Sequence, residues 1–308
     1  MKKIDIAKGE ISASEISLGF WRLSGISVNE ASVLINTALE EGINFFDHAV
    51  SYSEGRCEEI FSQAINMCPS IREKFFLQTK CGIRTDSGVY FDFSKEHILE
   101  AVDGSLKRLK TDYIDVLLLH RPDALMEPEE VAEAFTKLHS SGKVKYFGVS
   151  NMNPMQIELL SKYLNQKIII NQLQLSIAHT GMIDSGLNVN MRVDKSIDRD
   201  GGILDYCRLK DINVQAWSPF VYGHFEGIFL DNEKFPGINQ KLNEIAEIKG
   251  VTNSAIAVAW ILRHPAIIQT IVGTTKPGRL KDICKASQVE LTKVEWYEIY
   301  KSAGNNLP

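Results

Sequence analysis

The alternation of short apolar runs with segments of helical periodicity is the feature that most constrains the fold of this chain. Eight runs of strand length occur in succession, and a segment with helical spacing follows each one. The runs are residues 15–19, 43–47, 75–80, 114–120, 144–150, 167–172, 212–217 and 268–273. They are almost continuously apolar, which indicates burial on both faces and therefore parallel pairing.

The segments between the runs carry the start and stop signals of helices. Ser27 with Glu30 three residues later predicts a capping box, and Gly42 predicts the end of that first helix. Further helices are predicted at 54–67, 95–109, 128–140, 153–164, 202–209, 239–263 and 277–286. Eight parallel strands with right-handed helical crossovers close most simply into a (β/α)8 TIM barrel. A doubly wound open sheet is the alternative.

The chain is predicted to form one domain over residues 1–308. "KIDI" and "EISAS" flank Lys8 and Gly9 and predict a β-hairpin before the first run. No linker rich in Pro, Gly or Ser and no low-complexity tract divides the sequence. The longest connections, 176–201 and 218–238, follow predicted strands, where barrel loops usually carry function.

Composition excludes several classes of partner. A net charge of -5 provides no basic field for nucleic acid or an anionic membrane. The N-terminus has no signal-peptide core and no segment has the length of a membrane span, so we expect a cytoplasmic protein. The five cysteines are scattered and show no C-x-x-C spacing, which indicates neither a disulfide framework nor a zinc site.

Polar and aromatic side chains stand at nearly every predicted strand end. The carboxyl ends of the strands form the active-site face of such a barrel. In chain order they are Asp47 and Tyr52, Lys80, His120 with Arg121-Pro122-Asp123, Ser150 and Asn151, Asn171 and Gln172, Trp217-Ser218-Pro219, and Gly273-Thr274-Thr275. The Asp, Tyr, Lys and His side chains come from three successive strands and can therefore converge on one point.

Proton transfer to a carbonyl oxygen suits this quartet. The phenol of Tyr52 has an ordinary pKa of ~10, and a neighbouring ammonium lowers that pKa. Asp47 would keep Lys80 charged and in place, and His120 would donate a second hydrogen bond to the substrate oxygen. A metal-dependent hydrolase would need more ligands than the sequence offers, and His48 is expected to be structural. The second reactant is therefore expected to come from a cofactor.

Seven separated motifs, in order, resemble the aldo-keto reductase superfamily from about residue 11 to 290. They are "FFDHAVSY", "QTKCG", "DVLLLHRPD", "GKVKYFGVSN", "NQLQ", "AWSP" and "VGTTKPGRL". In addition, "LGFW" at 18–21 is similar to the Gly-x-Trp after the family's first barrel strand. The resemblance implies a barrel closed at its bottom by an N-terminal hairpin. It also implies hydride transfer between a nicotinamide cofactor and a carbonyl or alcohol.

The resemblance also implies roles for individual residues. Tyr52 is the implied general acid, Lys80 and Asp47 its tuning pair, and His120 the group that orients the carbonyl. The implied cofactor-binding set is Gly19, Phe20 and Trp21; Ser150, Asn151 and Gln172 for the carboxamide; Trp217 for the nicotinamide ring; Ser218 and Pro219 for the pyrophosphate; and Gly273, Thr274, Thr275, Lys276 and Arg279. Taken alone, Trp217 is more typical of a core aromatic.

The last motif favours NADPH over NADH. Lys276, Arg279, Thr274 and the N-terminus of the helix that begins at Pro277 would match a 2'-phosphate. Several family members place a lysine where this chain has Gly273, which changes the set of cations. No G-x-G-x-x-G follows any strand, so a Rossmann fold has no support beyond strand and helix alternation.

Two functions remain open at the level of sequence. The first is an NADPH-dependent reductase of aldehydes or ketones, a monomer whose partner is a small-molecule carbonyl compound. The second is a cofactor-binding regulatory or redox-sensing subunit with weak turnover, like the family's potassium-channel β-subunits. Substrate specificity is expected from the loops at 21–28, 121–125, 176–201 and 218–238. An aromatic pocket is expected from Phe20, Trp21, Tyr222, His224 and Phe225.

Overall fold

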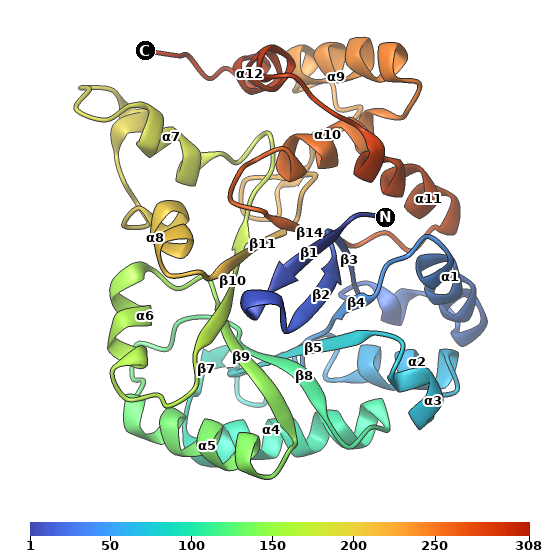
Figure 1. The fold of residues 1–308 in the computed structure, drawn as a ribbon, viewed down its shortest axis with the longest axis vertical. Coiled ribbons are helices and arrows are strands. Elements are labelled where there is room, and N and C mark those ends of the chain that lie inside the picture. Colours follow the sequence, from blue (N-terminus) through green and yellow to red (C-terminus); the bar gives the residue numbers. More distant parts are fainter.

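Eight parallel strands form a closed barrel at the centre of the molecule (Figure 1). The computed structural model describes residues 1–308. The barrel strands are β3 (Ile16–Gly19), β4 (Phe45–Asp47), β5 (Phe76–Cys81), β8 (Ile114–Leu119), β9 (Val144–Ser150), β10 (Ile168–Gln174), β11 (Asn213–Trp217) and β14 (Gln269–Val272). The last strand, β14, pairs in parallel with the first, β3, and so closes the ring. The predicted (β/α)8 barrel is confirmed, and the open doubly wound sheet is wrong.

The N-terminal hairpin covers one end of the barrel (Figure 1). Its strands are β1 (Lys3–Ile6) and β2 (Ile11–Ser14), which pair antiparallel as predicted. Ile6 and Ile11 belong to a cluster of eight buried apolar residues together with Val116 and Leu118 of β8. The hairpin therefore contributes side chains to the apolar packing of β8 and keeps water out of that end.

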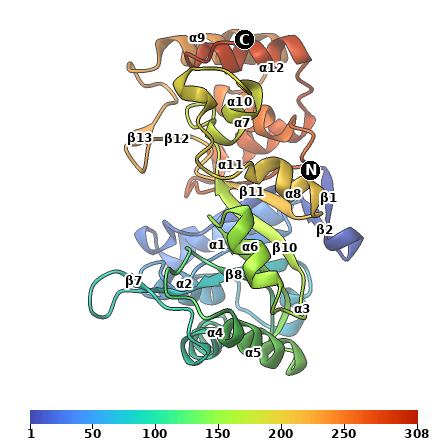
Figure 2. The same ribbon diagram turned by 90° about the vertical axis from the view of Figure 1, so that its left-hand side faces the viewer.

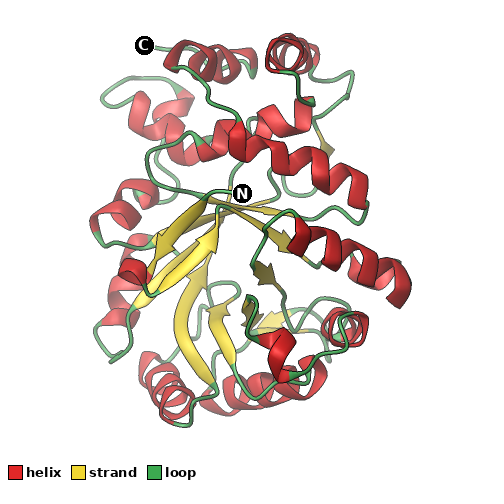
Figure 3. Cartoon of the chain, turned by 45° about the vertical axis from the view of Figure 1, so that its right-hand side comes forward, coloured by secondary structure: helices red, strands yellow, loops and turns green.

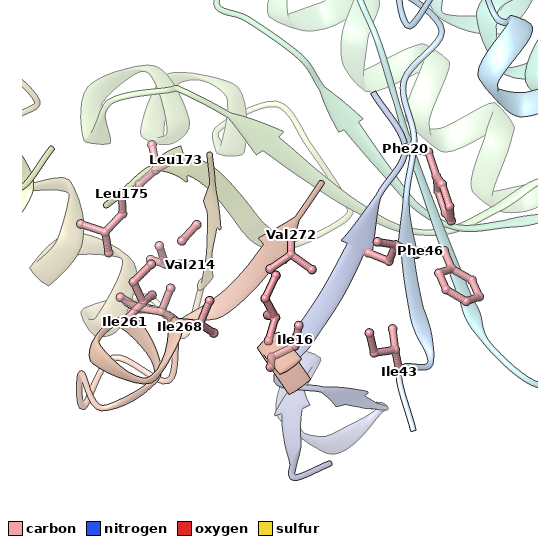
Figure 4. Close-up of a cluster of buried hydrophobic side chains, with 14 of the residues drawn as sticks. Ile16, Phe20, Ile43, Phe46, Leu173, Leu175, Val214, Ile261, Ile268 and Val272 are labelled. Atoms are coloured by element: carbon pink, nitrogen blue, oxygen red, sulfur yellow. The ribbon is translucent and has the colours of Figure 1, made fainter. Parts of the chain in front are cut away.

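Helices surround the strands (Figure 3). They are α1 (Val28–Glu40), α2 (Arg56–Ala64), α3 (Pro69–Arg72), α4 (Lys95–Leu109), α5 (Pro128–Ser140), α6 (Pro154–Ser161), α7 (Gly181–Leu187), α8 (Ile203–Leu209), α9 (Pro236–Lys249), α10 (Asn253–Leu262), α11 (Pro277–Cys284) and α12 (Lys293–Ser302). A continuous cluster of 70 buried apolar residues includes side chains from both strands and helices, part of which is shown in Figure 4. The predicted capping box of Ser27 and Glu30 is present at the start of α1.

The single helix predicted at 239–263 is wrong. The segment forms α9 and α10, which are bent by 93° with respect to each other. Gly250 ends α9 with a left-handed φ of 67°, and the side chain of Thr252 caps the start of α10. No single helix of the chain is long and apolar enough to cross a membrane; α9 and α10 satisfy that test only as a bent pair.

Three loops with structure of their own follow barrel strands. A hairpin of β6 (Ile83–Arg84) and β7 (Tyr90–Phe91) comes after β5, and the sequence did not predict it. The loop at 176–201 contains α7, and the loop at 218–238 contains the hairpin of β12 (Val221–Tyr222) and β13 (Gly227–Ile228). Figure 2 shows β7 and β13 on the opposite side of the molecule from β1 and β2.

Gly148 in β9 provides a test of how closely the barrel strands pack. A Cβ atom added there would lie 2.7 Å from the carbonyl oxygen of Ile170 and 2.5 Å from Leu118 Cδ2. Gly148→Ala is therefore expected to lower the free energy of unfolding by about 1–3 kcal/mol in urea denaturation. The control is Gly186→Ala in α7, where no atom lies within 4 Å of the added Cβ. Gly186→Ala should not lower the free energy of unfolding, because alanine is more favourable than glycine in a helix. Equal midpoints for the two variants would contradict this packing.

Candidate active site

A buried ion pair between Lys80 and Asp47 lies where two neighbouring strands end. Asp47 is the last residue of β4, and Lys80 lies one residue before the end of β5, with which β4 pairs in parallel. Lys80 Nζ donates to both carboxylate oxygens at 2.7 Å, to the carbonyl of His48 at 2.9 Å and to the hydroxyl of Tyr52 at 3.2 Å. The side chains of Lys80 and Asp47 are 0% and 2% exposed. The ammonium group therefore depends entirely on protein acceptors.

Two glutamine amides complete the hydrogen bonding of Asp47. Gln78 Nε2 donates to Asp47 Oδ1 at 2.6 Å, and Gln172 Nε2 donates to the same oxygen at 3.1 Å. A buried carboxylate is stable only when it is paired and fully hydrogen-bonded. The two amides and the ammonium together meet that requirement and fix the orientation of the carboxylate.

The same amides begin a row of four buried glutamines across the barrel interior. Gln215 Oε1 accepts from Gln78 at 2.9 Å and from Gln172 at 3.0 Å. Gln215 Nε2 donates to Gln269 Oε1 at 2.7 Å, and Gln269 Nε2 donates to the carbonyl of Ser14, in the hairpin, at 2.7 Å. Gln78, Gln215 and Gln269 were not predicted as site residues. Their signal in the sequence is a single glutamine within each of three apolar runs.

Tyr52 reaches the ion pair through the turn that follows β4. The backbone nitrogen of Val50 donates to the carbonyl of Lys80 at 3.0 Å, which ties this turn to β5. Residues 53–55 then have left-handed φ values of 50°, 56° and 83°, and the chain enters α2. Such backbone is uncommon outside glycine. The turn thus presents the phenol to Lys80.

Burial and the neighbouring charges set the protonation states of Tyr52 and Lys80. Burial raises the pKa of Tyr52, Lys80 lowers it, and the net pKa lies above the ordinary value. Lys80 thus lowers the pKa of Tyr52 as predicted, but burial, which the sequence did not reveal, has the larger effect. Burial lowers the pKa of Lys80, but Asp47 and Tyr52 outweigh burial and raise it. At neutral pH the phenol keeps its proton and the ammonium its charge.

His120 stands beside the phenol. Its ring lies edge-on to the ring of Tyr52 with centroids 5.9 Å apart, and its Nδ1 lies 3.4 Å from the hydroxyl of Ser51. Burial, together with the positive charges of Lys80 and Arg121, holds the pKa of His120 well below its ordinary value. The imidazole is therefore neutral at neutral pH, and one of its nitrogens can donate a hydrogen bond.

A cavity of about 490 Å³ opens above these groups, and 26 residues line it. Three of the four predicted catalytic residues line it: Asp47, Tyr52 and His120. The fourth, Lys80, lies behind Asp47 and Tyr52 and contacts both. All but one of the predicted cofactor residues also line it: Gly19, Trp21, Ser150, Asn151, Gln172, Trp217, Ser218, Pro219, Gly273, Thr274, Thr275, Lys276 and Arg279.

Phe20 is the exception, and its predicted place in the cofactor site is wrong. The side chain is 1% exposed and does not line the cavity. It packs in the core against Phe46 and Phe61, with ring centroids 5.6 Å and 5.0 Å away, and Figure 4 shows it beside Phe46. Successive side chains along a strand point to opposite sides, so Phe20 points away from the cavity that Gly19 lines. His48, which follows Asp47, is likewise buried outside the cavity and stacks on Phe20.

Hydrogen bonds hold Trp217 at the edge of the cavity. Its Nε1 donates to Asn151 Oδ1 at 3.1 Å, and Asn151 Nδ2 donates to Ser150 Oγ at 2.8 Å. The ring is only partly buried and stacks on Phe225 with centroids 5.7 Å apart. Trp217 is therefore a cavity residue and not a core aromatic.

The predicted aromatic pocket is only partly present. Trp21 and Phe225 line the cavity, and their ring centroids lie 5.2 Å apart. Tyr222 and His224 do not line it, and Tyr222 packs against Phe235 instead. The hairpin of β12 and β13 decides which of these side chains face inward, and strand periodicity does not predict the course of such a short loop hairpin.

Two cations gather where β14 leads into α11. Lys276 and Arg279 line the cavity, and neither forms an ion pair with a carboxylate of the chain. The backbone nitrogen of Lys276 donates to Thr274 Oγ1 at 3.2 Å. At Gly273 the nearest atom to an added Cβ, the carbonyl oxygen of Gly19, lies 4.0 Å away, so this position is open. No group of three or more His, Cys, Asp or Glu side chains is placed to hold a metal ion.

Comparisons with known proteins agree on one family. A family model described as the Aldo/keto reductase family matches residues 15–303. The uncharacterized oxidoreductase YcsN of Bacillus subtilis is 36% identical over 320 residues, which cover 100% of both chains. A 6-dehydroglucose reductase of Agrobacterium fabrum is 31% identical over 304 residues, which cover 96% of this chain and 95% of that protein.

A solved structure shares the fold. An aldo/keto reductase from Klebsiella pneumoniae, crystallised in complex with NADP and acetate, superposes with a TM-score of 0.76. The two chains are 22% identical, and the match covers 97% of this chain and 94% of that one. At this level of identity the likeness concerns the fold alone.

The Lys80–Asp47 pair can be tested by removing one charge or both. Lys80→Met leaves the carboxylate of Asp47 buried without a counter-charge and should lower the free energy of unfolding by about 3–5 kcal/mol. The double variant Asp47→Asn with Lys80→Met leaves no buried charge and should recover much of that loss in urea denaturation. The control is Lys95→Met, which breaks an exposed pair with Glu133 and should cost no more than about 1 kcal/mol. A double variant less stable than Lys80→Met would contradict the argument.

Proposed function

We propose that this chain, which belongs to the aldo/keto reductase family and is an NAD(P)H-dependent oxidoreductase, reduces an aldehyde or ketone to the alcohol with NADPH. The observation that carries the proposal is the contact of the Tyr52 hydroxyl with Lys80, beside the ring of His120 and at the wall of the cavity. When bound, the nicotinamide supplies a hydride to the carbonyl carbon. The chain must then supply one proton to the carbonyl oxygen, and Tyr52 is placed to do so.

Proton transfer requires separate roles of three residues: Tyr52, Lys80 and His120. The phenol is protonated at neutral pH because burial raises its pKa, so it can act as the acid. As its proton moves to the substrate oxygen, the phenolate that remains is stabilised by the ammonium of Lys80 at 3.2 Å. The neutral imidazole of His120 donates a hydrogen bond to the same substrate oxygen and fixes its position. Solvent then returns a proton to Tyr52.

The residues of the cavity fit a nicotinamide dinucleotide phosphate. Asn151 and Gln172 offer amide groups beside Trp217, whose partly exposed aromatic ring borders the cavity. Lys276 and Arg279 lie at the N-terminus of α11, where free backbone N–H groups and two unpaired cations suit a phosphate. NADP use also occurs within the aldo/keto reductase family, since the enzyme from Klebsiella pneumoniae was crystallised with NADP. NADH, which lacks the 2'-phosphate, would forgo these contacts.

The Tyr52→Phe variant tests the proton donor. It should bind NADPH with nearly unchanged affinity and lose about 100-fold or more of kcat with a reactive aldehyde such as 4-nitrobenzaldehyde, because phenylalanine has no proton to donate. NADPH oxidation measures the rate and quenching of protein fluorescence measures the binding. Tyr163, which does not line the cavity, provides the control, and Tyr163→Phe should retain full activity.

Two outcomes would contradict this assignment. Wild-type turnover by Tyr52→Phe would show that Tyr52 is not the donor. Negligible turnover by the unmodified chain across a panel of aldehydes, together with a stable complex in size-exclusion chromatography, would instead favour a regulatory or redox-sensing subunit. The cytoplasmic location and the monomeric state stay predictions.

The cofactor preference is tested at α11. Lys276→Met with Arg279→Met should raise KM for NADPH about 10-fold or more and leave KM for NADH within about 2-fold, because only NADPH carries the 2'-phosphate. Lys281→Met, on an exposed part of the same helix outside the cavity, is the matched control and should change neither KM. Equal increases for the two cofactors would exclude a 2'-phosphate contact.

A further inference from the structure

Arg121 is the only arginine of the chain that is at least half-buried and yet has no carboxylate partner. Three other arginines are buried or half-buried, and each forms an ion pair: Arg72 with Asp115 at 2.5 Å, Arg84 with Asp86 at 2.8 Å and Arg108 with Glu58 at 2.8 Å. Arg121 forms neither an ion pair nor a hydrogen bond with the chain. Its guanidinium instead lies over the ring of Trp217, 5.4 Å from the centroid.

No acidic side chain is available to neutralise Arg121. Asp123, two residues along, accepts from the backbone nitrogens of Phe93 at 3.0 Å and Leu125 at 2.8 Å. Asp47 is the only carboxylate among the residues that line the cavity, and it is held by Lys80. A half-buried cation without a counter-charge loses hydration that the ring of Trp217 replaces only in part, and burial accordingly lowers the pKa of Arg121.

The position of Arg121 separates it from the cations proposed for the cofactor phosphate. Arg121 follows the end of β8, whereas Lys276 and Arg279 follow β14. In the ring of eight strands, β8 is four places from β14, which is the opposite side of the barrel mouth. Arg121 is also the residue directly after His120 and lines the same cavity. Its guanidinium lies over Trp217, the proposed neighbour of the nicotinamide ring, so Arg121 borders the part of the cavity where the carbonyl compound would meet the nicotinamide.

We propose that Arg121 is the anion-binding residue of the substrate pocket, and that the preferred substrate is a small aldehyde or ketone carrying a carboxylate or phosphate group. This proposal rests on the proposed reduction of carbonyl compounds. The planar guanidinium fork binds such an anion with two parallel hydrogen bonds. The anion then supplies the counter-charge that the chain does not provide, and it orients the carbonyl toward Tyr52 and His120.

The experiment compares charged substrates with neutral ones of similar shape. The pairs are 4-carboxybenzaldehyde with its methyl ester, succinic semialdehyde with butanal, and glyceraldehyde 3-phosphate with glyceraldehyde. The first two pairs test a carboxylate, and the third tests a phosphate. The wild type should prefer the charged member of at least one pair. In Arg121→Met the charged-to-neutral ratio of kcat/KM for that pair should fall about 10- to 100-fold, mainly through KM.

Two variants of similar chemistry control the experiment. Arg22 also lines the cavity and lies over a tryptophan ring, 5.6 Å from the centroid of Trp21, but its side chain is exposed. Arg22→Met should therefore change the same ratio less than about 3-fold, because water screens an exposed charge. Arg121→Lys keeps the charge but loses the fork, and it should restore part of the preference.

Each failure has a distinct meaning. If the wild type reduces the neutral substrates at least as well as the charged ones and Arg121→Met leaves the ratios unchanged, the anion site is excluded and the reductase assignment stands. If Arg121→Met raises KM for NADPH and leaves the ratios unchanged, Arg121 is a cofactor residue and the proposal is wrong.

If the wild type shows no turnover, the anion site can still be tested by calorimetric titration of the NADP+ complex with succinate and with inorganic phosphate. Weaker anion binding to Arg121→Met than to the wild type would support the anion site. It would do so even if the wild type reduced no carbonyl compound, because the absence of turnover would refute only the proposed reductase activity. Equal binding, or no binding to either protein, would overturn the anion site.

Discussion

The buried ion pair of Lys80 and Asp47 is the interaction on which the rest of the site depends. Removing two charges from water is costly, and the cost is offset only when every donor and acceptor finds a partner. The structure meets this condition with a bidentate contact at 2.7 Å, two glutamine amides and the carbonyl of His48. Each partner is thereby fixed. The turn that bears Tyr52 is held against the pair, so the geometry of the proton donor is a consequence of satisfying the charges.

The interior of the barrel is divided between apolar and polar layers for the same reason. At the end covered by the hairpin, Val116 and Leu118 pack with Ile6 and Ile11. A row of four glutamines crosses the interior beside this apolar layer, from the carbonyl of Ser14 in the hairpin to the carboxylate of Asp47. A glutamine amide both donates and accepts hydrogen bonds. Neighbouring glutamines can therefore satisfy one another in the interior without adding a charge. The four amides therefore let the chain bury a carboxylate near the centre of a packed barrel.

Much of the fold and of the site could be predicted from the sequence. Eight apolar runs with helices between them leave few ways to bury every strand, and the closed barrel is the simplest. Because parallel strands all end at one face, residues such as Asp47, Lys80 and His120 could be assigned to one rim without any coordinates. The wrong predictions concern residues that lie outside the strands, where the rule that parallel strands end at one face does not apply. Phe20 lies one residue beyond its strand and points outward, and Gly250 ends a helix within a segment whose apolar periodicity continues to residue 263.

The sequence by itself determined the order of the strands, the rim on which the polar residues stand and the chemical types present there, because these follow from local patterns: continuous apolar runs of strand length and helical segments of period 3.6. Only the tertiary structure decided which groups touch and in what protonation state. The pKa of Tyr52 depends on burial by the surrounding chain as well as on Lys80, and burial outweighs the charge. The lack of a partner for Arg121 is likewise a property of the closed barrel. No local pattern reveals which carboxylates already have a partner, since ion pairs such as Arg72–Asp115 and Arg108–Glu58 join residues far apart in sequence.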